Sequence, residues 1–272
     1  GPIGFQRYWL RVQGYENKNL LKLIADTCFH KELDICAITS EEFDIPKDSV
    51  HDRFNYLVNE SRFLPNSYKA DKLDNIALII EKENKKTIIL NSQAVIVDEN
   101  GERLRHIVIG SNQLPNKKSL EYILKYCQDK ELIQIASNPY TQFGMGERRL
   151  EKYLDYYDAI EAHNSQFIIP ENLEFIPIIG KYNKKFNRVA KDLAIKNKKP
   201  YIAVSDAHRI EDLGISYIYF NKKLSLSNGK IFINDLKNII RNNEFEKMKR
   251  YEPILGLADW YLTFIMGISI NR

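Results

Sequence analysis

Short apolar runs rich in β-branched residues alternate along most of the chain with segments in which apolar residues recur every three or four positions. The first pattern is typical of buried strands and the second of helices packed on a sheet. Strands are predicted at residues 8–13, 34–39, 75–80, 87–90, 132–136, 159–162, 201–205 and 216–220. Helices are predicted between them at residues 20–31, 120–130, 147–157 and 185–196. This alternation predicts βα units around a parallel sheet, and the number of strands favours a barrel.

Two further patterns complete this prediction. Residues 94–97 and 104–109 flank the turn-forming residues 98–101 and predict an antiparallel hairpin. After residue 229 the chain is expected to form a helical tail, with helices at 235–242 and 244–249 and an apolar helix at 255–270. Because no repeat or flexible linker divides the chain, we expect one barrel at residues 7–228, with residues 229–272 packed on it as an extension.

Composition excludes several classes of protein. With 44% apolar and 28% charged residues, the 272-residue chain is neither disordered nor fibrous. The net charge of +4 is too small to argue by itself for a polyanionic partner. The spacing of Cys28, Cys36 and Cys127 fits neither a disulfide framework nor a zinc site and favours a reducing, cytoplasmic compartment. The apolar run at 255–270 is short for a membrane span and contains Asp259, so we expect none.

The candidate chemistry lies at the predicted strand ends, where barrels of parallel strands place their sites. Asp206 and His208 follow an apolar strand two residues apart, and this pair could ligate one ion or two adjacent ions. Alternatively, Asp206 caps the next helix. The other candidates near strand ends or in the hairpin are Arg11, Gln13, Ser40, Glu41, Gln93, His106, Asn138, Glu161 and Asn164. A hydrogen-bonded core histidine remains an alternative for His106, and a role in tying loops together remains one for Glu161 and Asn164.

Five segments carry a resemblance to a known family. Residues 157–165 (YDAIEAHNS) and 201–208 (YIAVSDAH), followed by Leu213-Gly214, resemble the C-terminal half of a PHP (polymerase and histidinol phosphatase) domain. Residues 34–41 are similar to the strand of that family that ends in Thr-Asp-His, and residues 136–139 to its Ala-His-Pro turn. Residues 8–13 stand where the family opens with Asp-Leu-His-x-His.

The resemblance implies a distorted (β/α)7 TIM-like barrel that holds up to three zinc, manganese or iron ions and hydrolyses phosphoesters. Of the ligands that it implies, His106, Asp206 and His208 are present. The remaining ligand positions are occupied by Arg11, Gln13, Ser40, Glu41, Gln93 and Asn138. Most of these side chains are poor ligands for such ions. We therefore expect no cofactor, with zinc or manganese as the candidates if the remnant site is occupied.

Without metal ions, the acidic residues at the implied ligand positions lack a counter-charge. Burying Asp206 and Glu41 without a cation would cost several kcal/mol each. Arg11, at the end of the first predicted strand, is the expected counter-charge, with its guanidinium in the former metal space.

Three functions follow from these residues. The leading hypothesis is a catalytically inactive PHP-like barrel that acts as a binding, scaffolding or regulatory module within a larger assembly and takes a phosphate-bearing ligand through Arg11. The alternative is a phosphoesterase with one or two ions held by His106, Asp206 and His208, with Glu41 as a further candidate ligand. A nucleic-acid-binding module is the third, because eight basic residues lie in or beside one predicted helix: Lys181, Lys184, Lys185, Arg188, Lys191, Lys196, Lys198 and Lys199. That stripe is also consistent with a solvated helix face.

Overall fold

The computed structural model describes residues 19–41, 53–99, 102–115, 118–137, 139–141, 144–171 and 183–253. Three predicted site residues, Arg11, Gln13 and Asn138, lie outside these residues, as do the predicted strand at 8–13 and the apolar segment at 255–270. Glu41 ends a described strand, but its side chain is not among the described ones.

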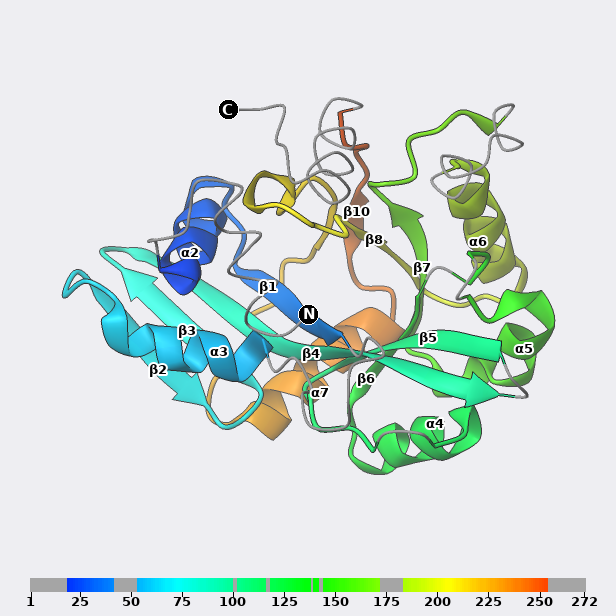
Figure 1. Cartoon of the computed structure of the whole chain (residues 1–272), viewed down its shortest axis with the longest axis horizontal. Helices are drawn as coiled ribbons and strands as arrows, with labels where there is room; N and C mark the ends of the chain where they lie inside the picture. Colours follow the sequence, from blue (N-terminus) through cyan, green and yellow to red (C-terminus); the bar gives the residue numbers. More distant parts are fainter. Residues whose placement is uncertain are drawn as a thin grey trace.

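A single large sheet with helices on both faces forms the body of the protein (Figure 1). The described helices are α2 (Leu20–His30), α3 (Arg53–Glu60), α4 (Leu120–Asp129), α5 (Gly146–Lys152), α6 (Lys185–Lys196) and α7 (Gly229–Arg241). The strands are β1 (Ile35–Glu41), β2 (Tyr68–Leu73), β3 (Ala77–Lys82), β4 (Lys85–Glu99), β5 (Glu102–Ile109), β6 (Ile133–Ala136), β7 (Ala159–Asn164), β8 (Tyr201–Val204), β9 (Tyr217–Tyr219) and β10 (Glu246–Met248).

The sheet is mixed and mostly antiparallel, which corrects the prediction of a parallel one. Its order is β2-β3-β4-β5-β6-β7-β8, with β1 parallel to β4. Neighbours from β2 to β6 are antiparallel, and only β6–β7 and β7–β8 continue in parallel. Short turns explain the antiparallel pairs from β2 to β5, because such turns permit only hairpins. Strands β5 and β6 are antiparallel although α4 lies in the connection between them. The described strands form an open path, and closure into a barrel is not observed among them.

Several predicted elements are confirmed. The hairpin around residues 98–101 is β4–β5, in which Val97 pairs with Leu104. Helix α6 has the predicted bounds, and α2 and α4 end one residue short of theirs. The sequence pattern missed α3 and β2, because both are rich in polar residues; β2 exposes half of its side chains.

The C-terminal region differs from the helical tail that we expected. Helix α7 starts at Gly229, where Asn228 caps it by accepting a hydrogen bond from the amide of Ile231. Asn243 then adopts a left-handed conformation with φ of 53° and ends the helix. Residues 244–249, predicted as a second helix, instead contain β10, which pairs with β9.

Alternate residues of each strand contact different helix layers. Leu104 and Val108 of β5 pack in a core with α4, α5 and α6, whereas Ile107 and Ile109 pack in a second core with α7. A third core joins α2 and α3 to Leu78, Ile80 and Ile89. The sheet therefore has an α7 side and an opposite side, and each strand residue can be assigned to one of them. None of the described helices is long and apolar enough to cross a membrane.

Candidate functional site

Polar residues extend the α7 side of the sheet beyond its apolar core. Arg105 lies two residues from Ile107 on β5, and Glu161 lies two residues from Ala159 on β7. Asp206 follows Val204 at the end of β8. Because strand side chains alternate with a period of two, these residues continue the same face. The sequence therefore delivers one basic and two acidic side chains to one region.

A single amide joins the two carboxylates. The Nδ2 group of Asn164 donates to Oε1 of Glu161 at 2.8 Å and to Oδ2 of Asp206 at 3.0 Å. The hydroxyl of Ser137 donates to Oε2 of Glu161 at 3.0 Å. Asn164 and Glu161 are almost completely buried. This geometry confirms that the strand ends of β6, β7 and β8 meet at one place.

The bridging amide is itself held rigidly. Oδ1 of Asn164 accepts from the backbone amide of Gln166 at 2.9 Å. The backbone of Asn164 exchanges two hydrogen bonds with the side chain of Asn187 on α6, at 2.8 and 3.0 Å. Both amide hydrogens therefore point at the carboxylates, because the opposite orientation would leave the amide of Gln166 without its acceptor.

The two carboxylates have opposite pKa shifts. Burial raises the pKa of Glu161 to about 7, and the charge of Asp206 adds to this; the Asn164 and Ser137 hydrogen bonds and Arg105 oppose it. Burial also acts to raise the pKa of Asp206, but the charges of His208 and Arg105 and the Asn164 hydrogen bond outweigh it and lower that pKa. Asp206 is therefore the ionised partner at neutral pH, while Glu161 is close to its midpoint.

Arg105 is the described basic residue whose charge acts on both carboxylates. The sequence analysis expected Arg11 in this role and overlooked Arg105, which lies next to the candidate His106. Period-two alternation along β5 was the signal that could have found it, since neighbouring residues of a strand point to opposite faces. The placement of Arg11 stays a prediction, because it lies outside the described residues.

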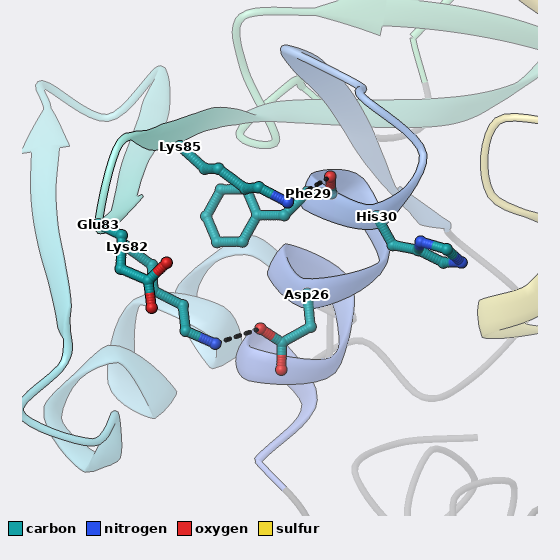
Figure 2. A pocket seen from close by; sticks show the side chains of 6 residues that line it. All are labelled: Asp26, Phe29, His30, Lys82, Glu83 and Lys85. Atoms are coloured by element: carbon teal, nitrogen blue, oxygen red, sulfur yellow. Dashed lines mark hydrogen bonds and ion pairs between the residues drawn. The ribbon is translucent and has the colours of Figure 1, made fainter.

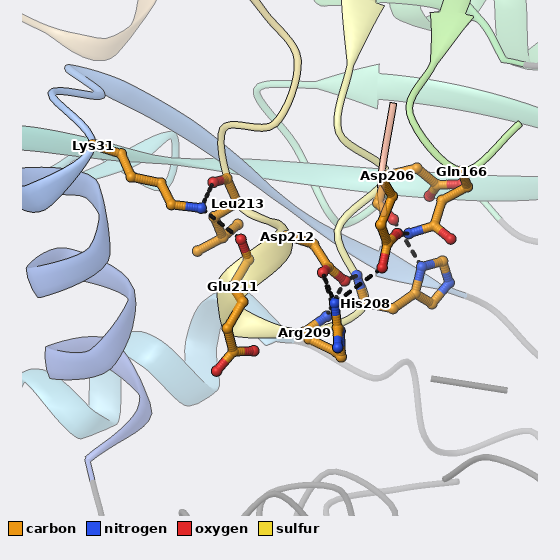
Figure 3. A network of polar contacts seen from close by, with 9 residues as sticks. Lys31, Gln166, Asp206, His208, Arg209, Glu211, Asp212 and Leu213 are labelled. Carbon is orange, nitrogen blue, oxygen red and sulfur yellow. Dashed lines mark hydrogen bonds and ion pairs between the residues drawn. The ribbon is translucent and has the colours of Figure 1, made fainter. Parts of the chain in front are cut away.

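The loop after β8 is a folded turn (Figure 3). Asp206 has a left-handed backbone with φ of 50°, and Nδ1 of His208 lies 2.7 Å from its carbonyl oxygen. Asp212 caps the following turn, accepting from the backbone amides of His208 and Arg209 at 3.2 and 2.9 Å. Asp212 rather than Asp206 thus provides the cap, which leaves the Asp206 carboxylate to Asn164.

A buried ion-pair network fixes the loop to the C-terminal segment. The Arg209 guanidinium pairs with Asp212 at 2.8 Å and with Glu252 at 3.0 Å. Gln166 donates to the other oxygen of Glu252. The Arg209 side chain is 9% exposed and the two carboxylates are fully buried. Lys31 of α2 holds the far end of the loop through the carbonyls of Glu211 and Leu213, as Figure 3 also shows.

Three candidates on the central strands lie on the opposite side of the sheet. His106 pairs with Val95 and Gln93 with Val108, both in the core with α4. Ser40 is the register partner of Gln93 and accepts from the backbone amide of Arg53 at 3.1 Å. Oε1 of Gln93 accepts from the amide of Leu114 at 3.1 Å. The structure does not bring these three residues together with Glu161, Asn164 and Asp206.

His106 is a core residue of unusual kind. It is fully buried, and its ring lies edge-on to Tyr157 with centroids 5.3 Å apart. Neither ring nitrogen makes a hydrogen bond to a described residue. Burial lowers its pKa to about 3, which an interaction with Gln134 only partly opposes. The imidazole is therefore neutral in the folded protein.

We expect His106→Leu to reduce the acid sensitivity of the fold. The unfolded chain takes up a proton at His106 below pH 6.5, whereas the folded protein does so only near pH 3. The free energy of unfolding therefore decreases as the pH is lowered from 6.5 towards 3. At pH 7 the free energy of unfolding of the variant should differ from that of the wild type by less than about 1 kcal/mol. Below pH 6.5 it should gain on the wild type by up to about 1.4 kcal/mol for each unit by which the pH is lowered. Urea unfolding at pH 4 to 7 measures this, with exposed His30→Gln as the control. Parallel pH curves for His106→Leu and the wild type would contradict it.

The described donor set does not fit a three-ion centre. Asp206 and Glu161 are bridged by N–H donors, which occupy carboxylate oxygens that would otherwise face a cation. No group of three His, Cys, Asp or Glu side chains in the described ranges could hold a metal ion. Carboxylate and imidazole would be supplied here by Asp206 and His208 alone.

A shallow depression lies elsewhere, between α2 and the β3–β4 turn (Figure 2). Its volume is about 210 Å³, and it is lined by Asp26, Phe29, His30, Lys82, Glu83 and Lys85. Asp26 and Lys82 pair across it at 3.5 Å. None of these residues belongs to the polar region at the ends of β6, β7 and β8, so we do not identify this depression with the candidate site.

Comparison with known proteins gives one family match in sequence and six matching structures, two of which are given below. Residues 184–238, from the start of α6 into α7, match the model of a family described as PHP-associated. No curated protein matches. The crystal structure of PsfC from Pseudomonas syringae PB-5123 is similar with a TM-score of 0.51 at 13% identity, over 82% of this chain and 88% of that chain. Endonuclease Q, in a complex with a 27-mer duplex carrying an abasic lesion at the active site, gives a TM-score of 0.47 at 12% identity, over 81% of this chain and 51% of that chain. The likeness to PsfC shows a shared fold.

Proposed function

We propose that the chain is a member of the PHP superfamily, which the match of residues 184–238 to a PHP-associated family supports, and that it is a non-hydrolytic PHP-type module that binds a phosphate-bearing ligand and serves as a binding, scaffolding or regulatory unit. The complete fold that we propose is the distorted seven-stranded barrel of the superfamily. One observation carries the proposal: the Asn164 amide donates both of its hydrogens to the two acidic residues of the site.

An amide between Glu161 and Asp206 cannot perform the chemistry of a metal ion. Hydrolysis by this superfamily relies on ions that lower the pKa of a bound water and clamp phosphate oxygens. An N–H donor holds carboxylates together but supplies no Lewis acid. With Asn164 fixed by Asn187 and by Gln166, its hydrogens are committed to Glu161 and Asp206. This supports a binding role over a hydrolytic one.

The charges at the site favour an anionic ligand. Arg105 is the cation whose charge acts on both acids, and Glu161 titrates near neutral pH. Protonation of Glu161 leaves Asp206 as the ionised acid opposite Arg105. An incoming phosphate would therefore meet less negative charge when Glu161 is protonated than when both acids are ionised.

The alternative function is a phosphoesterase with one or two ions. It is favoured by the proximity of His208 to Asp206 and of Asp206 to Glu161. Under this alternative, Asp206 and His208 would be the ligands, together with Glu41. The two functions differ in whether Asp206 is needed for turnover.

One set of assays separates them. We expect the full chain, incubated with Mn²⁺ or Zn²⁺ and bis(p-nitrophenyl) phosphate, to give no turnover above that of the Asp206→Ala variant. Calorimetric titration with inorganic phosphate should show binding that Arg105→Gln weakens about tenfold, as expected for loss of one charged hydrogen-bonding group. Lys125→Gln, which removes an exposed charge paired with Glu121, is the matched control.

Two results would overturn the proposal. One is turnover that Asp206→Ala abolishes, together with a stoichiometric transition metal that survives dialysis. The other is phosphate binding that Arg105→Gln and Lys125→Gln change equally.

A further inference from the structure

A row of lysine side chains and tyrosine rings runs along the edge of the protein where β10 lies next to β8. Nζ of Lys247 and of Lys249 lie 4.4 and 4.8 Å from the ring centroid of Tyr201. Nζ of Lys184, just before α6, lies 4.4 Å from the ring centroid of Tyr251. We call these five residues the lysine–tyrosine stripe.

The stripe is continuous. Beneath Tyr251 lies the ring of His163 at 4.8 Å, and the charge of Lys249 lowers the pKa of that histidine, after the larger effect of burial. Lys247 and Lys249 lie over the same ring, that of Tyr201, whereas Lys184 lies over the ring of Tyr251. The cations of the stripe therefore form two groups, one at each tyrosine.

The three lysines of the stripe have no acidic partner among the described residues. None of them forms an ion pair with a described carboxylate. By contrast, Arg188 and Lys196 on α6 pair with Glu171 and with Glu147 and Glu151. The nearby acids are turned away: Glu252 is buried against Arg209, and Glu246 is paired in register with Tyr219 on the other face of the β9–β10 ribbon from Lys247.

Lysines that lie close together with no acidic partner in the described ranges raise the local positive potential. Burial lowers the pKa of Lys247; Tyr201 opposes this, and the charge of Lys249 adds a smaller lowering. A ligand that carries negative charges at regular intervals would relieve this repulsion at several points together. A single phosphate would relieve it at only one.

We propose that the lysine–tyrosine stripe binds single-stranded nucleic acid. The two groups of cations, Lys247 and Lys249 at Tyr201 and Lys184 at Tyr251, suit separate phosphates of an extended strand. Interleaved aromatic rings are the second feature of surfaces that bind such strands, because every base can stack on them without sequence preference. Tyr251 is 40% exposed and is the ring best placed for this. The surface is separate from the Glu161–Asp206 region, so it adds a second ligand to the proposed module.

The proposal predicts how steeply binding weakens with salt concentration. Each lysine that contacts a phosphate of a single strand releases counterions and contributes about 0.7 to the slope of log K against log salt concentration. Three lysines therefore predict a slope of about −2. Each Lys→Gln substitution in the stripe should reduce its magnitude by about 0.7.

Fluorescence anisotropy of the full chain with a labelled 20-nucleotide oligo-dT tests the proposal. We expect Lys247→Gln/Lys249→Gln to weaken binding tenfold or more at 50 mM salt and Tyr251→Leu to weaken it severalfold. The control variant Lys125→Gln/Lys196→Gln removes the same charge from exposed lysines that have acidic partners. It should bind within twofold of the wild type.

Three outcomes would overturn the proposal. The first is equal weakening by the stripe and control variants. The second is binding that does not respond to salt. The third is inorganic polyphosphate competing as well as the oligonucleotide while Tyr251→Leu has no effect, which would assign the stripe to polyanions without bases. Asp206→Ala should leave oligonucleotide binding unchanged, so this proposal and the proposed function can fail separately.

Discussion

Asn164→Asp should be among the most destabilising substitutions in this protein, lowering the free energy of unfolding by about 4 kcal/mol. The change removes two hydrogen bonds to carboxylates and places a third carboxylate between Glu161 and Asp206. It leaves the contacts to Asn187 and Gln166 intact, because these use the backbone and Oδ1. The penalty therefore arises from charge and not from lost packing. Urea unfolding at pH 7.5 measures it.

Two further variants show whether the bridge is the cause. Asn238→Asp makes the same chemical change on the exposed face of α7 and should cost less than about 0.5 kcal/mol. The exchange Glu161→Gln/Asn164→Asp lets the new amide at 161 donate to the new carboxylate at 164. It should recover about half of the loss, since Asp206 still lacks its donor. A double variant no more stable than Asn164→Asp would contradict the bridging role.

Arg209→Met should cost a comparable amount, about 3–5 kcal/mol, because it leaves the carboxylates of Asp212 and Glu252 buried without their shared cation. Methionine fills similar space, so the loss reports mainly on the missing charge. Arg188→Met is the matched control. Arg188 makes an exposed ion pair with Glu171, and such pairs contribute at most about 1 kcal/mol.

The pH dependence of this variant follows from Glu252. Burial and the charge of Asp212 raise the pKa of Glu252 to about 8, and Arg209 opposes them. Between its ordinary value of 4.5 and about 8, this carboxyl is protonated in the folded protein and ionised in the unfolded chain. Stability from this group therefore falls as pH rises through that window.

Removing Arg209 raises this pKa further, so the deficit of Arg209→Met should be larger at pH 8.5 than at pH 5.5. Glu252→Gln in the same background should flatten the difference. The ion-pair network of Arg209, Asp212 and Glu252 would be contradicted if Arg209→Met and Arg188→Met lowered the free energy of unfolding equally. It would also be contradicted if the loss caused by Arg209→Met did not depend on pH.

The sequence pattern predicted individual elements better than their pairing. Helix α6 was placed correctly because its apolar face repeats with helical period and polar residues flank both ends. The direction of the strands was wrong for most of the sheet, since an apolar run looks the same in parallel and antiparallel pairs. Turn residues decide between them, and only the turn at residues 98–101 was strong enough to be recognised.

The candidate site was predicted best where chemistry and strand ends coincide. Glu161, Asn164 and Asp206 were all selected, and the structure brings these three together. His106 and Gln93 were selected from spacing along the family pattern, and they lie on the other side of the sheet. A shift of one residue reverses the face of every strand side chain, so spacing that is correct to within one residue still misplaces them. Arg105 was overlooked for the same reason.

The polar strand β2, which the apolar pattern could not reveal, protects one margin of the sheet. Among the described strands it is the outermost, pairing only with β3. An unpaired margin offers backbone groups to a strand of another molecule and so invites aggregation. Lys69, Asp71 and Lys72 project from β2 into solvent, and Lys69 and Asp71 form an ion pair at 2.7 Å. A second copy paired in parallel register with this margin, as in many fibres, would bring like charges together. The same polarity that hides β2 from pattern analysis therefore disfavours that pairing.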